Sequence, residues 1–254
     1  MNFSDAELER YARHIVLPEI GGAGQAALKA ARVLVVGAGG IGSPALQYLA
    51  AAGVGNLFVI DHDQIDLSNL QRQTLFGSGE VGGSKAAVAV EALERLNPDI
   101  RPGGFSVRLN ADNIAEIFEL TQPQVILDGT DNFETRLLVA DAALRHRVPL
   151  VSAAVGRFEG QLGVFRGWEA DKPCYRCFVG NDPETAGINC SEQGVLGALT
   201  GIMGSLAALE VIRAIHPFGE DSAGKLLLAD TLALRFRTLT LPKDPGCPVC
   251  TGVR

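Results

Sequence analysis

The sequence feature that most constrains the fold is a glycine-rich turn between an apolar run and a helical pattern. Residues 32–36 form a short β-branched run, GAGGIG follows at 37–42, and a helical pattern begins at Pro44. A second apolar run at 56–60 ends in Asp61. Strand, glycine turn, helix and strand make a βαβ unit with parallel strands and a right-handed crossover. The chain is therefore predicted to open as a Rossmann-like α/β fold.

The alternation of strands and helices continues through the middle of the chain. Helices are expected at 85–96, from about 113, and at 133–146, with strands near 105–109, at 125–128 and at 150–155. A strand at 161–165 follows without an intervening helix, which indicates antiparallel pairing, and 225–241 holds two more short strands. We therefore expect one domain with a doubly wound sheet, parallel in its N-terminal half (1–155) and mixed or antiparallel in its C-terminal half (156–254).

The net charge and the first residues indicate where the protein works. A net charge of −7 argues against a nucleic-acid-binding surface. Residues 1–17 contain a predicted helix that is led by Ser4, with Glu7 completing a capping box, and Pro18 and GGAGQ at 21–25 are expected to end it in a turn. The segment has neither the basic start nor the apolar run of a signal peptide, so a cytoplasmic location is expected.

The longest uncharged stretch of the chain lies between Glu192 and Glu210. Its length alone would allow a membrane span. Glycines punctuate the stretch and charged residues follow it directly, which favours a buried, closely packed helix. No membrane partner is expected.

Three glycines of the turn have separate tasks in nucleotide binding. Gly37 permits the tight turn, Gly39 lets the backbone approach a phosphate, and Gly42 lets the helix pack closely on the strand. The N-terminus of that helix offers N–H groups to an anion. Asp61 ends the next strand, where a carboxylate accepts hydrogen bonds from a ribose hydroxyl. The pattern predicts an adenine nucleotide and does not separate NAD from ATP.

Two cations favour ATP. Arg72 lies in the segment SNLQRQ, and Lys85 lies at a predicted helix start. A triphosphate that is cleaved needs fixed cations against its developing charge, whereas a dehydrogenase binds pyrophosphate mainly through backbone N–H groups. For either cation alone, a solvated surface position is the common alternative. An NAD-dependent oxidoreductase is therefore kept as a rival hypothesis.

Two carboxylates follow the strand predicted at 125–128. Asp128 and Asp131 would lie at the carboxyl edge of a parallel sheet, where Mg²⁺ would find oxygen ligands. Asp131 or Asn132 is equally suited to cap the helix predicted at 133–146. The residues alone leave open both the metal site and the choice between the two aspartates.

Four cysteines form two C-x-x-C pairs. Cys174 and Cys177 make the first pair, and Cys247 and Cys250 make the second. Four thiolates suit tetrahedral Zn²⁺ with no open position, which is typical of a structural site. A redox dithiol is the competing hypothesis, and two pairs favour zinc over it. The site would tie the C-terminal tail to the middle of the chain.

The fifth cysteine, Cys190, lies in a polar segment at 178–194 that is predicted to be a long loop. Long loops in compact domains are usually functional. A reactive thiol that forms a thioester or a disulfide is one hypothesis, and a buried small hydrophobic residue is the other. The sequence leaves both open.

Together these motifs resemble the ThiF/MoeB/HesA family, the bacterial relatives of ubiquitin-activating enzymes. The resemblance spans nearly the whole chain and rests on an ordered set of motifs. They are RYARHIVLPEIGGAGQ (10–25), GAGGIG (37–42), DHDQIDLSNLQRQ (61–73), GGSK (82–85), DGTDN (128–132) and both C-x-x-C pairs. The family adenylates sulfur-carrier proteins for thiamine and molybdopterin synthesis.

The resemblance implies a role for each matching residue. Gly39 and Gly40 would approach the phosphates, Asp61 the ribose, Asn69, Arg72 and Lys85 the triphosphate, and Asp131 the Mg²⁺, with Gln73 and Asn132 in the same site. Arg13 would reach across a homodimer into the partner's site. Cys190 matches the crossover-loop cysteine, which is covalently linked to the carrier in some relatives only. Residues 156–254 would form the carrier-binding half.

The resemblance also implies the partners. A ubiquitin-like sulfur carrier with a Gly-Gly C-terminus would be the substrate, since a tail without side chains threads easily to the α-phosphate. Because the sequence shows no rhodanese-like segment after Cys250, sulfur is expected from a separate donor protein. Besides the oxidoreductase, a non-catalytic nucleotide-binding scaffold for a ubiquitin-like protein is the second rival hypothesis.

Overall fold

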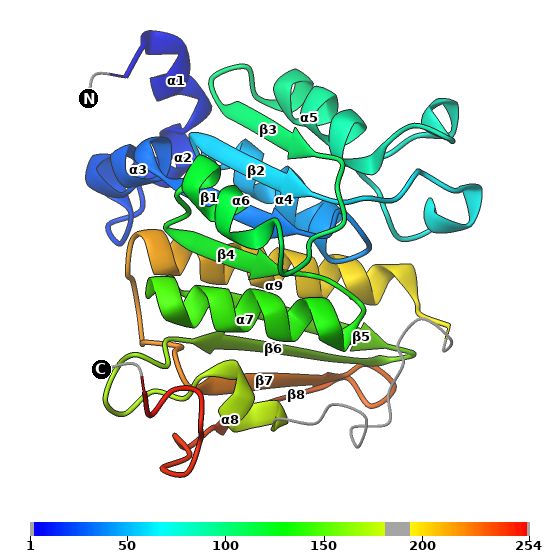
Figure 1. The fold of residues 1–254 in the computed structure, drawn as a ribbon. Coiled ribbons are helices and arrows are strands. Elements are labelled where there is room, and N and C mark those ends of the chain that lie inside the picture. Colours follow the sequence, from blue (N-terminus) through cyan, green and yellow to red (C-terminus); the bar gives the residue numbers. More distant parts are fainter. Residues whose placement is uncertain (1–2, 181–193, 253–254) are drawn as a thin grey trace.

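One mixed sheet runs through the molecule, as Figure 1 shows for the computed structural model, which describes residues 3–180 and 194–252. Within those residues eight strands pair in the order β3-β2-β1-β4-β5-β6-β7-β8. The strands are β1 (Arg32–Val36), β2 (Asn56–Ile60), β3 (Arg101–Phe105), β4 (Val125–Asp128), β5 (Leu150–Gly156), β6 (Glu159–Phe165), β7 (Lys225–Asp230) and β8 (Arg235–Thr240). Pairing is parallel from β3 to β5 and antiparallel from β5 to β8, which confirms the predicted change of direction.

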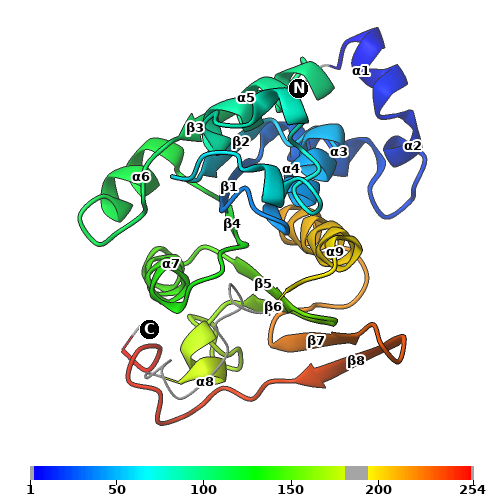
Figure 2. The same ribbon diagram turned by 90° about the vertical axis from the view of Figure 1, so that its right-hand side faces the viewer.

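Helices cover both faces of the sheet. The helices of the described residues are α1 (Asp5–Arg10), α2 (Ala12–Ile15), α3 (Gly21–Ala30), α4 (Gly42–Ala51), α5 (Lys85–Leu96), α6 (Ile114–Thr121), α7 (Phe133–His146), α8 (Tyr175–Val179) and α9 (Gly197–Ile215), with short 3₁₀ turns η1 (Leu67–Asn69) and η2 (Ser78–Glu80). Along β1, Val33 and Val35 pack with α4, α5 and α9, while Leu34 and Val36 pack with α6 and α7. Figure 2 shows α7 and α9 on opposite sides of the sheet. Both layers are apolar, as expected for a doubly wound fold.

The helix α9 was expected to be buried, and it is only partly so. By length and composition it is apolar enough to cross a membrane, and 39% of that stretch is buried inside the structure. Leu199, Met203, Ala207 and Val211 face inward and are buried. They belong to the same apolar cluster as α4 and β6, so this helix is part of the core of the fold.

Two local predictions were wrong. The GGAGQ segment does not end a helix in a turn, because Gly21 begins α3. Packing overrides its poor helix propensity: a Cβ on Gly24 would lie 2.8 Å from the His216 ring, and Gln25 is fully buried.

The strand expected near 105–109 lies earlier, at β3. Its glycines are poor strand formers that the packing requires, since a Cβ on Gly104 would lie 2.8 Å from the carbonyl oxygen of Ala86 in α5.

Candidate functional site

The glycine turn joins β1 to α4 as predicted. Gly37 has φ +90°, a conformation that side chains other than glycine rarely adopt. A Cβ on Gly42 would lie 1.8 Å from the carbonyl oxygen of Gly37, so the first helical turn folds directly back onto the strand end. The N-terminus of α4 is thereby fixed at the carboxyl ends of β1, β2 and β4, where doubly wound folds bind ligands.

A cavity of about 470 Å³ opens at this edge of the sheet. This volume lies in the usual range for small-molecule sites. The lining includes ten of the residues predicted for the nucleotide site, namely Gly37, Gly39, Gly40, Asp61, Asn69, Arg72, Gln73, Lys85, Asp131 and Asn132. Gly42 supports the turn from behind the lining. Segments as far apart in the sequence as 37–42 and 128–132 therefore meet in one site.

Asp61 is a nearly buried acceptor in the cavity wall. Its two carboxylate oxygens accept hydrogen bonds from the N–H groups of Ala38 (2.8 Å) and Asp63 (2.9 Å). Burial raises the pKa of Asp61 above its ordinary value, although the charge of Lys85 and the two N–H groups act in the opposite direction. An ionised carboxylate has about four acceptor positions, so two remain for a ligand.

The two aspartates after β4 have different surroundings. Asp128 is fully buried, and it accepts hydrogen bonds from the Thr130 hydroxyl (2.7 Å) and the Ser152 hydroxyl (2.9 Å). Asn132 caps α7 by accepting a hydrogen bond from the N–H of Thr135 (2.9 Å). The structure thus assigns the cap to Asn132 and structural hydrogen bonds to Asp128.

Asp131 is the exposed acid of this segment. It lines the cavity, and its carboxylate makes no hydrogen bond or ion pair with the residues that the structure describes. Its oxygens are available to a hard cation such as Mg²⁺, which prefers one or two carboxylates together with phosphate oxygens.

Three charged residues in the lining were missed by the sequence reasoning: Asp63, Arg108 and Arg136. Asp63 pairs with Lys85 at 2.8 Å. Arg136 is buried and donates to the carbonyl oxygen of Ala153 at 3.2 Å. Its place in the first turns of α7 was a usable signal, because this helix begins at the cavity. Arg108, in the loop after β3, had no sequence signal.

Of the other predicted site residues, one lies away from the cavity and one falls outside the residues that the structure describes. Arg13 is an exposed residue of α2 and does not belong to the lining. The segment before it is fastened to the core, since the buried amide of Asn97 donates to the Tyr11 hydroxyl at 2.8 Å. Cys190 lies outside the described residues, as does most of the loop predicted at 178–194. The start of that loop is helical instead, in α8.

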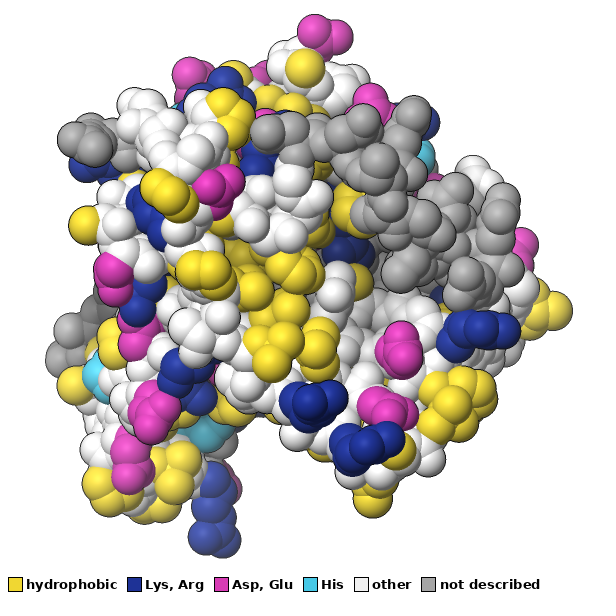
Figure 3. Space-filling view, turned by 90° about the horizontal axis from the view of Figure 1, so that it is seen from below, with side chains coloured by type: hydrophobic (Ala, Val, Ile, Leu, Met, Phe, Trp, Pro, Cys, Tyr) yellow, Lys and Arg dark blue, Asp and Glu magenta, His cyan; other side chains and the backbone are white. Residues whose placement is uncertain are grey.

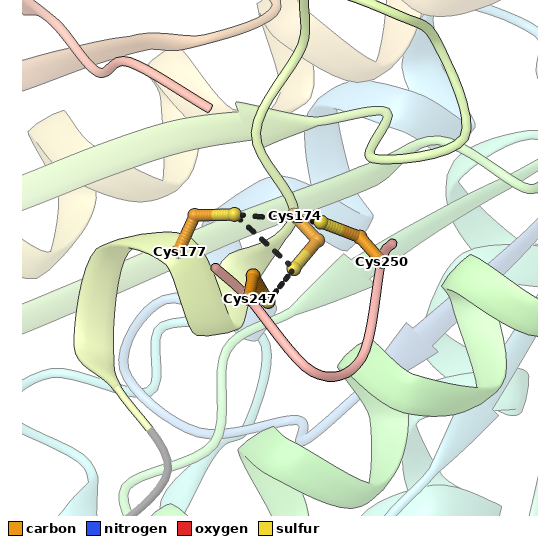
Figure 4. Close-up of side chains that lie close together, drawn as sticks. All are labelled: Cys174, Cys177, Cys247 and Cys250. Atoms are coloured by element: carbon orange, nitrogen blue, oxygen red, sulfur yellow. Dashed lines mark hydrogen bonds between the residues drawn. The ribbon is translucent and has the colours of Figure 1, made fainter. Parts of the chain in front are cut away.

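The four paired cysteines meet in one cluster, shown in Figure 4. Sulfur–sulfur distances are 3.6 Å for Cys174–Cys177, 3.7 Å for Cys174–Cys247 and 3.6 Å for Cys177–Cys250. Four sulfurs at about 2.3 Å from a tetrahedral Zn²⁺ would be about 3.8 Å apart. The donor set and its spacing therefore fit a structural zinc ion.

Burial and the surrounding groups shift the pKa values of three of these thiols. Burial, with the neighbouring sulfurs, raises the pKa of Cys174 well above its ordinary value and that of Cys250 to about 11. The pKa of Cys247 is lowered: burial raises it, but backbone N–H groups of Cys250 and Val249 lower it more. A divalent ion would stabilise all four thiolates and couple its binding to folding.

The cluster is joined to the helix that begins at the cavity. Arg176, between the first two cysteines, donates to both carboxylate oxygens of Asp141 in α7, at 2.8 and 2.7 Å. Bidentate pairs of this kind fix orientation as well as distance. The C-terminal tail is thereby tied through α8 to α7.

The close packing at Gly42 predicts a large difference between two glycine substitutions. Gly42→Ala is expected to destabilise the fold by about 3 kcal/mol, because its methyl group would overlap the Gly37 carbonyl. Gly39→Ala is the matched control, since the nearest atom to its Cβ is 4.0 Å away, and a change of less than about 0.5 kcal/mol is expected. Urea unfolding measures both, and equal losses would contradict the packing argument.

Relatives in sequence match nearly the whole chain. The sulfur carrier protein adenylyltransferase of Thermus thermophilus is 44% identical, over 98% of this chain and 93% of that protein. The molybdopterin-synthase adenylyltransferase of Escherichia coli is 42% identical, over 97% of this chain and 98% of that protein. The probable adenylyltransferase/sulfurtransferase MoeZ of Mycobacterium tuberculosis is 44% identical, but the match covers only 64% of its length.

Solved structures share the fold. A crystal structure of E. coli MccB with ATP matches with a TM-score of 0.81 at 23% identity, covering 97% of this chain and 75% of that chain. The model of the ThiF family matches residues 11–249, from α2 to the second cysteine pair. With relatives above 40% identity over nearly their full length, this match shows that the chain belongs to the ThiF family.

Proposed function

We propose that this chain adenylates the C-terminal glycine of a ubiquitin-like sulfur-carrier protein, giving an acyl-adenylate and pyrophosphate. The observation that carries the proposal is one cavity that combines an acceptor for ribose, cations for a triphosphate and an acid, Asp131, that has no partner among the described residues and could hold a metal ion. The adenylyltransferases among the relatives support the same reaction class. The carrier would serve molybdopterin or thiamine synthesis, and the protein would work in the cytoplasm.

Each residue of the cavity has a separate role in the proposed reaction. The glycine turn and the α4 N-terminus bind phosphate, Asp61 accepts from ribose hydroxyls, and Asn69 and Gln73 line the same wall. Lys85 and Arg72 stabilise charge that develops as the carrier carboxylate attacks the α-phosphorus and pyrophosphate leaves. Asp131 would hold Mg²⁺, which would neutralise phosphate oxygens when bound.

The product explains the need for the reaction. A carboxylate is a poor electrophile, whereas the acyl phosphate is a mixed anhydride that a sulfur nucleophile can attack with loss of AMP. A separate donor protein would provide that sulfur. Whether Cys190 takes part through a covalent bond is open within this proposal. The zinc cluster contributes stability, since its cysteines are not among the lining residues of the described cavity.

The proposed role of Arg13 makes a prediction about a homodimer that can be tested. Because it is exposed and outside the lining of its own cavity, it would complete the site of a second copy in a homodimer. Arg13→Ala and Lys85→Ala are each expected to be inactive. Unfolded together and refolded, the two variants should recover roughly a quarter of the wild-type activity, since half of the dimers are mixed and carry one intact site. No recovery, with dimers verified by light scattering, would assign Arg13 to its own site.

The proposal is tested by carrier-dependent exchange of radioactive pyrophosphate into ATP. Candidate carriers from molybdopterin and thiamine synthesis are offered in turn, each with a control lacking the terminal glycine. Exchange with one intact carrier supports adenylation and identifies the branch. ATP binding without exchange would favour the non-catalytic scaffold, and binding of NAD in place of ATP would favour the oxidoreductase.

A further inference from the structure

Lys85 is placed by a short segment that lies beside it. The N–H of Ile65 donates to the carbonyl of Gly83 and the N–H of Gly82 donates to the carbonyl of Ile65, both at 2.8 Å, and the N–H of Lys85 donates to the carbonyl of Asp63 at 3.0 Å. These bonds bring residues 63–65 against the start of α5. The side chain of Lys85 emerges into the cavity wall with only 6% of its surface exposed.

The ammonium group of Lys85 meets one carboxylate there. Its Nζ lies 2.8 Å from Oδ2 of Asp63, whose side chain is 53% exposed and lines the cavity. The other carboxylate oxygen of Asp63 lies 3.5 Å from Nε2 of the exposed His62. The backbone N–H of Asp63 donates to the carboxylate of Asp61. Partial burial raises the pKa of Asp63, but the hydrogen bond and charge of Lys85 lower it more, so this carboxyl group is ionised at neutral pH.

We propose that Asp63 is the positioning residue for Lys85: it holds the ammonium at the cavity wall before the nucleotide binds and shares it with the triphosphate afterwards. Its consequence for catalysis rests on the proposed function, whereas the contact itself does not. A nearly buried ammonium without an anion is unfavourable, so an unpaired Lys85 would turn toward solvent or lose its proton. A cation fixed in advance stabilises charge in the transition state without reorganisation.

The substitutions separate the charge of Asp63 from its shape. Asp63→Ala removes the acceptor, and Asp63→Asn keeps an oxygen that accepts from Nζ. Asp66→Asn is the matched control, because Asp66 feels the charge of Lys85 without touching it and caps η1 through the N–H of Ser68, which asparagine also does.

The first readout is independent of catalysis. An amine-reactive acylating reagent is applied without nucleotide, and labelling of each lysine is followed by mass spectrometry. Asp63→Ala is expected to raise the labelling rate of Lys85 about tenfold, Asp63→Asn less, and Asp66→Asn not at all. Lys225, which begins β7 and pairs with Glu220, serves as the internal reference. An unchanged rate at Lys85 in Asp63→Ala would overturn the proposal.

The second readout is the exchange reaction. Asp63→Ala is expected to lower kcat about tenfold with a smaller change in KM for ATP, because loss of carboxylate repulsion offsets the loss of orientation. Asp63→Asn should recover part of kcat, and an unchanged kcat in Asp63→Ala would again overturn the proposal. MgATP should protect Lys85 of the wild type from labelling. If it does not, while Asp63→Ala still raises labelling, the pairing stands and the proposed nucleotide function fails.

Discussion

Replacing Asp131 with alanine is expected to lower carrier-dependent pyrophosphate exchange by a factor of about 10² to 10³. Its carboxylate is the acid in the cavity wall without a hydrogen bond or ion pair among the described residues, so its removal leaves a metal ion without that protein ligand. The same exposure predicts that the fold tolerates the change. The free energy of unfolding, measured with urea, should therefore change by less than about 0.5 kcal/mol.

Asn132→Ala is the matched control for Asp131→Ala. It removes the cap of α7, and the loss of the hydrogen bond to the N–H of Thr135 should destabilise the protein by about 1 kcal/mol. Exchange should fall far less than in Asp131→Ala. If the two variants lose exchange equally, the segment acts by shaping the helix start, and the assignment of the metal ligand to Asp131 is wrong.

The first half of the fold could be predicted because local signals and tertiary structure agree there. The apolar run at β1, the glycine turn and the acid after β2 each have one compatible arrangement, and the structure has it. The predictions of local structure were wrong where tertiary packing, and not local propensity, determines which residue is tolerated. Gly103 and Gly104 lie in an edge strand under α5, and Gly24 packs on His216, so their local propensities indicate a turn or loop.

The site divides in the same way. Motif spacing and the family resemblance together predicted ten residues that line one cavity. The different surroundings of Asp128 and Asp131 depend on the neighbouring strand, because the hydroxyl of Ser152 in β5 donates a hydrogen bond to Asp128. The role of Asp63 needed the pairing of 63–65 with the start of α5, which no local pattern indicates. Local patterns in a single sequence do not indicate which residues far apart in the chain come into contact.

The largest expected effect on stability comes from the cysteine cluster. The double variant Cys247→Ser, Cys250→Ser removes two of four thiolates that lie within 4.8 Å of one another, so zinc content should fall from about one ion per chain to near zero. Because metal binding is coupled to folding, several kcal/mol should be lost, and Tm should fall by about 10 °C or more. Metal analysis and calorimetry measure the two effects.

The location of the cluster predicts where this loss appears. Cys174 caps the helix α8 and Cys177 lies within it, and Arg176 of the same helix binds Asp141 of α7. Release of the metal should therefore loosen the C-terminal tail and α8 first. Hydrogen exchange should increase there before it increases in β1 or α4, which pack in a separate apolar cluster. Cys190→Ser is the control, since it removes a thiol and should leave the zinc content unchanged. A variant that keeps its Tm after losing the metal would show that the four cysteines pack well enough alone, and the cluster would then need a role other than stability.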